Sequence, residues 1–255
     1  MAVIALCSVS GSPGVTTTAV ALAWNWTRPV TLVEADPVGG SAMLAGVFKG
    51  VREYRAGLVE LALSPLDPGD ALQEVGDPVE GTPVTFVAGP RSPAQVPSLE
   101  PVWGRLADAL DDLDKAGQDV IVDAGRLGMR GSPEPLLALA DLTLIVTRAN
   151  LVALAAVRPW AASLAERALA WRDAGLLVVG PGQPYSVKDV ATTLGLPVVA
   201  TIADDADAAA VYHRGEPAAR RWGSGPYRRS VRAAVDAIGS RIARGRAELL
   251  EGVTP

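Results

Sequence analysis

The sequence has one cysteine, one histidine, few aromatic residues (5%) and no long apolar run. A single cysteine, Cys7, excludes an internal disulfide and a cysteine-based zinc site. The single histidine, His213, argues against Ser-His-Asp catalysis and against multi-histidine metal centres. The N-terminus shows a strand pattern without a secretory leader, and no apolar run reaches the roughly 18 residues of a membrane helix. We therefore expect a cytoplasmic protein with no membrane span.

Lysine is also scarce: it occurs at positions 49, 115 and 188 only, which indicates a coding bias toward arginine. The net charge of -5 is distributed unevenly, because residues 211–255 contain nine arginines and four acidic residues. With 255 residues, 49% hydrophobic and 20% charged, the chain is long enough and apolar enough for one sizeable core. We expect a single domain over residues 1–255, with an arginine-rich C-terminal helical segment at about 211–255.

Aliphatic runs alternate with helical patterns along the chain. The runs that predict strands are residues 3–9, 30–33, 83–88, 119–123, 142–146, 176–179 and 198–202. The segments that predict helices are 17–26, 57–63, 102–113, a stretch that ends at 170, and a last helix with Val231, Val235, Ile238 and Ile242 on one face. The Pro- and Gly-rich stretches 64–80 and 89–101 are predicted to be loops. This alternation predicts an α/β fold with a doubly wound, mostly parallel sheet flanked by helices on both faces.

A turn of small residues lies between the first strand and the first helix. Such turns are typical of phosphate-binding loops, because their N–H groups and the helix N-terminus attract anions. The candidate nucleotide-binding residues are Gly11, Ser12, Pro13, Gly14, Val15, Thr16 and Thr17. The Thr16 hydroxyl is also a candidate magnesium ligand. The general P-loop pattern fails at Val9 and Val15, which replace a glycine and the lysine, so a purely structural helix start stays an alternative.

Two aspartates follow predicted strands at the same edge of the sheet. Asp36 comes after the strand 30–33 and Asp123 ends the strand 119–123. Ligands of open α/β sheets bind at this edge, where a carboxylate holds a magnesium-bound water or orients an attacking one. The alternative is that both carboxylates only cap turns or helices.

Several segments, in this order, resemble motifs of the ParA/MinD superfamily of deviant Walker P-loop ATPases. Residues 10–19 are similar to K-G-G-x-G-K-T-T-T-A, residues 33–37 to the D-x-D-P motif, and residues 120–123 to the Walker B strand. Residues 57–63, 140–147 and 194–217 look like further segments of the family. The resemblance implies ATP and Mg²⁺ as ligands and a homodimer. It also implies that Thr16 and Asp123 are metal ligands and that Asp36 is the catalytic residue that orients water.

The sequence departs from this family at the positions that bind phosphate. Ser10 stands where the signature lysine is expected and Val15 where the Walker lysine is expected. Pro13 removes a backbone N–H, and the segment 179–182 lacks the asparagine that lies near adenine in the family. Loss of two charge-assisted contacts costs about 10²–10⁴-fold in affinity. We therefore expect ATP and Mg²⁺ to bind weakly and hydrolysis to be at most weak.

The resemblance implies a degenerate family member in subcellular localisation or in assembly of a pilus or secretion machine, as in the TadZ/CpaE-type proteins. The alternative is an active ParA/MinD-type ATPase for plasmid or chromosome partitioning or cell positioning. A synthetase or amidotransferase is disfavoured, because no further substrate domain follows residue 210.

The expected partners are a protein of that apparatus and, through the arginine-rich segment, DNA. The arginine-rich segment is equally compatible with a solvated helix face on which Arg228, Arg229 and Arg232 lie together. Trp222, among glycines and arginines, is a candidate partner contact. His213 is expected at the solvated surface.

Overall fold

The computed structural model describes residues 2–38, 41–112, 117–166 and 168–252. Its strands are β1 (Val3–Ser8), β2 (Val30–Glu34), β3 (Asp77–Pro78), β4 (Val84–Val87), β5 (Asp119–Arg126), β6 (Leu142–Arg148), β7 (Ala174–Val179) and β8 (Val198–Ile202). Its helices are α1 (Val15–Asn25), α2 (Leu58–Leu63), α3 (Pro68–Val75), α4 (Glu100–Asp112), α5 (Glu134–Leu139), α6 (Leu151–Ala165), α7 (Val187–Leu194), α8 (Ala206–His213) and α9 (Pro226–Gly252). Shorter helical turns cover η1 (Met43–Val47), η2 (Pro93–Ser98) and η4 (Trp222–Ser224).

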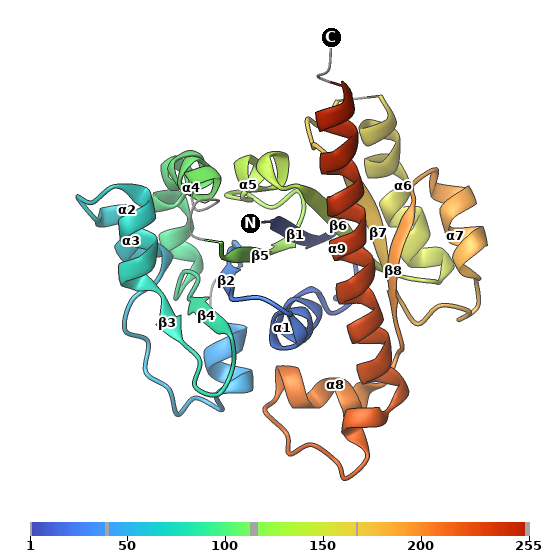
Figure 1. Ribbon diagram of the computed structural model, residues 1–255, viewed down its shortest axis with the longest axis horizontal. Coiled ribbons are helices and arrows are strands. Elements are labelled where there is room, and N and C mark those ends of the chain that lie inside the picture. The colour runs from blue at the N-terminus through green and yellow to red at the C-terminus, as the bar shows by residue number, and fades with distance from the viewer. Residues whose placement is uncertain (1, 39–40, 113–116, 167, 253–255) are drawn as a thin grey trace.

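The strands form one eight-stranded sheet in the order β3-β4-β2-β5-β1-β6-β7-β8 (Figure 1). Neighbouring strands are parallel, apart from the antiparallel pair of β3 and β4. β1 lies between β5 and β6, so the segment that follows β1 emerges between the carboxyl ends of these two strands. The predicted α/β fold with a mostly parallel sheet is confirmed.

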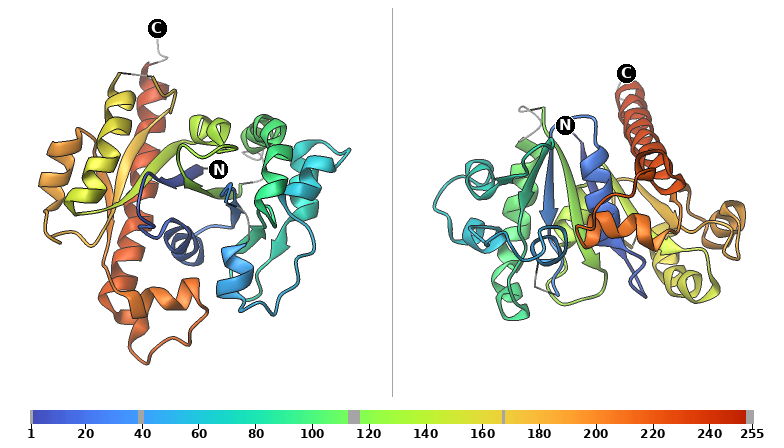
Figure 2. Two further views of the ribbon diagram at one scale, coloured as in Figure 1. Left: turned by 180° about the vertical axis from the view of Figure 1, so that it is seen from behind. Right: turned by 90° about the horizontal axis from the view of Figure 1, so that it is seen from below.

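Helices cover both faces of the sheet (Figure 2). α1, α8 and α9 pack against one face, and α2 to α7 contribute to the core on the other face. β1 serves both cores because its side chains alternate: Val3, Ala5 and Cys7 enter one core, and Ile4 and Leu6 enter the other. All five side chains are at most 3% exposed, which explains why the strand reads as an unbroken aliphatic run.

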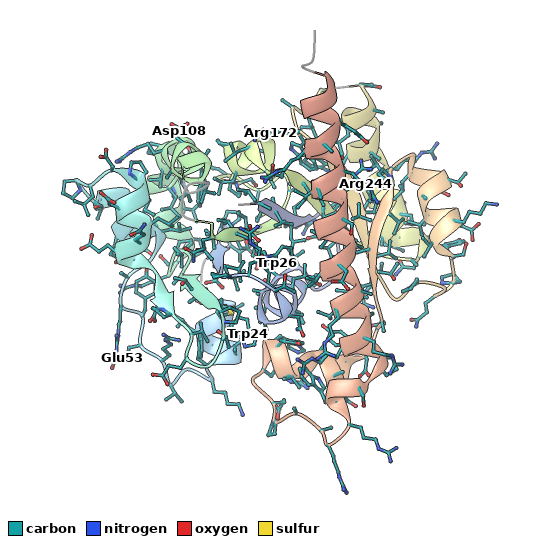
Figure 3. The ribbon with its side chains drawn as sticks, viewed as in Figure 1. Trp24, Trp26, Glu53, Asp108, Arg172 and Arg244 are labelled. Carbon is teal, nitrogen blue, oxygen red and sulfur yellow. The ribbon has the colours of Figure 1, made fainter. Side chains whose placement is uncertain are left out.

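The predicted apolar stripe of the last helix is confirmed. Val231, Val235, Ile238 and Ile242 of α9 are at most 7% exposed and pack in the same core as α1. Trp26, near the centre of Figure 3, closes this core beside the C-terminus of α1, and its ring N–H donates to Asp119 Oδ2 at 2.9 Å. None of the described helices is long and apolar enough to cross a membrane.

The structure corrects several predicted boundaries. The stretch 64–80, predicted to be a loop, contains α3 and β3, and 89–101 contains η2 and the start of α4. Proline is tolerated in the first turn of a helix, and the buried residues of α3 are Ala71, Leu72 and Val75, so an apolar face outweighs the Pro-Gly start. The helix predicted to end at 170 ends at Ala165, and β5 continues past residue 123 to Arg126. Residue 113, the end of another predicted helix, lies outside the described residues.

Candidate functional site

The loop between β1 and α1 has the backbone geometry of an anion cradle. Gly11, Ser12 and Gly14 have φ values of 76°, 50° and 98°, in the left-handed region, where a serine is uncommon. α1 begins directly after Gly14, and no described side chain caps that residue. Left-handed residues followed by a helix N-terminus turn successive N–H groups toward one point, where an anion binds.

Among the loop side chains, Val15 and Pro13 carry neither charge nor a donor toward that point. Val15 is 6% exposed and packs in the core with α1 and β1, so its aliphatic side chain is used for packing. Pro13 is buried and lacks a backbone N–H. The Ser10 hydroxyl, at the other position where the resemblance places a lysine, is half-buried and uncharged. The loop therefore combines an anion-binding backbone with no cation of its own.

Asp123 lies at the base of this loop with one carboxylate oxygen unsatisfied. In the sheet it is in register with Leu6 of β1 and with Glu34 of β2. Oδ1 accepts from the Gly125 N–H at 3.1 Å, whereas Oδ2 is buried and has no hydrogen-bond partner among the described residues. Burial raises the pKa of Asp123 to about 7, the Thr16 hydroxyl lowers this pKa, and the charges of Glu34 and Asp36 raise it further. A buried oxygen of this kind is a group that a cation or a cation-bound water satisfies.

Asp36 lies against the end of β5. A Cβ atom on Gly125, which has a φ of 60°, would lie only 2.3 Å from the Asp36 Cγ, so the carboxylate packs directly on the glycine. Asp36 Oδ1 also accepts from the Val38 N–H at 2.9 Å, which closes a turn. The structure thus brings Asp36, Asp123 and Thr16 together, and it also gives Asp36 the turn-closing contact that the alternative interpretation expected.

Glu34 fixes this edge of the sheet, a role that sequence reasoning missed. Its side chain is 5% exposed and accepts from the N–H groups of Ala42 (2.8 Å), Met43 (3.4 Å) and Gly89 (3.2 Å). These bonds tie the segment after β2 to the segment after β4. Burial raises the pKa of Glu34, and the bonds partly offset this rise. The only signal in the sequence is that Glu34 stands two residues before Asp36.

Two cavities flank the loop and share Pro13 and Arg148 in their lining. A cavity of about 160 Å³ lies toward β7 and β8, between Gly14, Thr17 and Asp204. A larger one of about 490 Å³ lies toward α6. Its lining is Ser10, Gly11, Pro13, Arg148, Asn150, Leu151, Val152 and Ala153. Pockets for complete small ligands span roughly 300–1,000 Å³, so the first cavity is large enough for only part of a nucleotide.

Two arginines near the loop were missed because the predicted strands ended too early. Arg126 is the last residue of β5, and its Nε donates to the Val9 carbonyl at 3.2 Å. Arg148 is the last residue of β6, and its Nη1 lies 2.6 Å from Asp204 Oδ2. Extending each aliphatic run to its first charged residue would have found both.

Part of the arginine-rich segment contacts the chain itself. Arg241 makes a two-point ion pair with Asp173 at 2.7 and 2.9 Å, and Arg246 pairs with Asp141 at 3.0 Å. Both arginines line a cavity of about 440 Å³ together with Arg172 and Arg244, the two arginines labelled in Figure 3. These contacts use charge that the sequence analysis had assigned to DNA.

The expected exposure of Arg228 is wrong. It is half-buried, its Nε donates to Asn25 Oδ1 at 3.2 Å, and its guanidinium lies 4.7 Å from the centre of the Trp222 ring. The Trp222 ring N–H donates to the Ala208 carbonyl at 3.0 Å, so this tryptophan already has partners within the chain. His213 is half-buried rather than solvated, and its Nδ1 lies 3.0 Å from the Ala209 carbonyl.

Comparison with known proteins was made at the level of sequence and of structure. No family model and no curated protein matches the sequence. The structure is similar to the cell division ATPase MinD of Pyrococcus furiosus, with a TM-score of 0.75 and 15% identity over 94% of this chain and 98% of that chain. It is also similar to MinD of Pyrococcus horikoshii complexed with Mg-ADP (TM-score 0.71, 16% identity, 93% and 95% covered). A ParA family ATPase of Chlorobium tepidum is a third neighbour (TM-score 0.73, 14% identity, 92% and 98% covered). The chain has the fold of the ParA/MinD ATPases.

Proposed function

We propose that this protein binds a nucleoside triphosphate with Mg²⁺ at the loop 10–17, weakly, and hydrolyses it negligibly. Binding would then act as a signal for localisation or assembly of a partner. The observation that carries this proposal is the unsatisfied Oδ2 of Asp123, buried beside Thr16 at the base of an anion cradle. The complex of the Pyrococcus horikoshii neighbour with Mg-ADP supports nucleotide as the ligand class.

The residues present fit a magnesium ion that arrives with its nucleotide. Among the described residues, no group of three or more His, Cys, Asp or Glu side chains could hold a metal. Mg²⁺ usually binds through one or two protein groups, several waters and phosphate oxygens, which suits Thr16 and Asp123. When bound, the ion would supply charge that neutralises the phosphates. The loop N–H groups would hold the phosphates, and Asp36 would orient a water molecule.

The same residues explain why turnover is expected to be negligible. Phosphoryl transfer depends on cations that are already placed where charge develops. Ser10 and Val15 place no ammonium there, and Val15 is packed in the core. Asp36 can position a water without stabilising the charge that forms on the phosphates. Weak binding with almost no hydrolysis follows from this combination.

Two biological roles are compatible with such a site. We favour a localisation or assembly factor of a pilus or secretion machine, acting as a homodimer with a protein partner, because the atypical loop resembles the TadZ/CpaE-type proteins. The second candidate is an active ATPase for partitioning or cell positioning. The close approach of Thr16, Asp36 and Asp123 favours that candidate, because these three groups are the ones that hydrolysis requires.

Titration calorimetry with ATP, in the presence and absence of Mg²⁺, tests the proposal. We expect a dissociation constant on the order of 0.1–1 mM with Mg²⁺. Asp123→Asn should remove most of the dependence on Mg²⁺. Asp70→Asn, the same change at an exposed position of α3, is the matched control. Absence of ATP binding at millimolar concentration, or an unchanged response of Asp123→Asn to Mg²⁺, would overturn it.

A further inference from the structure

The two strands that flank the loop-bearing strand each end in an arginine. β1 lies between β5 and β6, and the last residues of these neighbours are Arg126 and Arg148. We propose that Arg126 and Arg148 bind the phosphates from the two sides of the loop and supply the positive charge that Ser10 and Val15 do not. This inference rests on the proposed function, because it assigns the cations of that same site.

Arg126 lies at the start of the loop. Its backbone is in register with Ser8, and its Nε donates to the carbonyl of Val9, the residue before Ser10. The side chain is exposed, so its remaining guanidinium N–H groups are accessible to a ligand at the loop. An arginine that starts on β5 thus reaches the position where a lysine of the loop itself would begin.

Arg148 lies on the opposite side. It lines both cavities that meet at Pro13, and the loop residues Gly11 and Gly14 line one cavity each. Its guanidinium is held at 2.6 Å from Asp204, and these side chains are 41% and 31% exposed. An ion pair at this exposure is worth only about 0–1 kcal/mol, so a phosphate group can replace Asp204 as the partner at small cost.

The chemistry of arginine suits this arrangement. A guanidinium stays charged and presents a planar set of donors that matches two phosphate oxygens at once. A cation on a neighbouring strand needs no space inside the loop, which is consistent with Val15 packed in the core and Pro13 buried between the cavities. The buried, unsatisfied Oδ2 of Asp123 independently marks the same point as a ligand site.

Inorganic tripolyphosphate with Mg²⁺ is the probe, because it contains the phosphates of a nucleotide without the base. We expect Arg126→Ala and Arg148→Ala each to weaken its binding roughly 10- to 100-fold in calorimetry. Arg148→Lys should lose less than Arg148→Ala. Asp204→Asn should strengthen binding several-fold, because it removes the competing partner of Arg148. Arg158→Ala, at an exposed arginine of α6 that lines neither cavity, should bind like the wild type.

The opposite signs expected for Arg148 and Asp204 keep the test decisive if one variant folds poorly, which circular dichroism would reveal. Wild-type binding of tripolyphosphate with unchanged affinity in both arginine variants would overturn this inference and leave the proposed function standing. Wild-type binding of Mg-ATP without tripolyphosphate binding would also overturn it. Absence of binding of either compound would remove the proposed function as well.

Discussion

Asp123→Asn should change how the stability of the nucleotide-free protein depends on pH. Burial raises the pKa of this carboxyl from 3.8 to about 7, so the folded chain retains a proton that the unfolded chain releases between these values. The free energy of unfolding therefore falls as the pH rises through this window. A shift of about three pKa units corresponds to about 4 kcal/mol, and the loss is complete at pH 8.

Asparagine cannot ionise, so Asp123→Asn should remove this pH-dependent loss. Relative to the wild type, the variant should gain up to about 4 kcal/mol at pH 8 but only about 1 kcal/mol at pH 4.5. Thr16→Val should have the opposite effect on the profile, because it removes the hydroxyl that lowers the pKa of Asp123. In Thr16→Val, stability should continue to fall to a higher pH than in the wild type.

Urea unfolding followed by circular dichroism between pH 4.5 and pH 8 measures these differences. The dependence of the unfolding free energy on urea should be the same in all three proteins, which shows that the same surface is exposed. Parallel pH profiles for the wild type and Asp123→Asn would refute the reasoning. That result would mean that Asp123 is not forced to choose between a proton and an uncompensated buried charge.

Three further predictions follow from the loop, the sheet edge and the last helix. Gly125→Ala should cost about 1–3 kcal/mol of stability in urea unfolding, because φ is 60° and the new Cβ would overlap Asp36; Gly104→Ala, on α4 with open space around it, should instead be neutral or stabilising. Val15→Lys should bind Mg-ATP at least about tenfold more tightly in calorimetry, and unchanged affinity with an intact fold would contradict a preserved phosphate cradle. Arg229→Glu with Arg232→Glu, both at exposed positions of α9, should weaken any binding of duplex DNA in anisotropy titrations, with a salt dependence reduced by about 0.9 per lost phosphate contact. No wild-type binding at low salt would eliminate DNA as a partner.

The central strands and the site edge could be predicted from the sequence because their signals are local. β1 and the Val-Ile-Val part of β5 are aliphatic runs buried on both faces, and the small residues after β1 indicate the loop directly. Asp36 and Asp123 could be placed at one edge because parallel strands share their carboxyl ends. Their contact through Gly125 depends on a left-handed glycine, which the sequence does not reveal.

The features that were missed depend on packing between distant segments. α3 begins with Pro68-Gly69, a signal for a loop, and its buried face becomes visible only against α4. Arg228 is drawn inward by Asn25, 203 residues away in the sequence. The unsatisfied oxygen of Asp123 is defined by what surrounds it, so no pattern in the sequence identifies it.

Phosphate release from saturating Mg-ATP, with and without a candidate partner protein, tests the central claim most directly. The account predicts binding of nucleotide without phosphate release above the background rate. Asp36→Ala, which removes the carboxylate beside Gly125, should leave that background unchanged. Tight binding of Mg-ATP together with clear turnover that Asp36→Ala abolishes would contradict the account and identify a working ATPase.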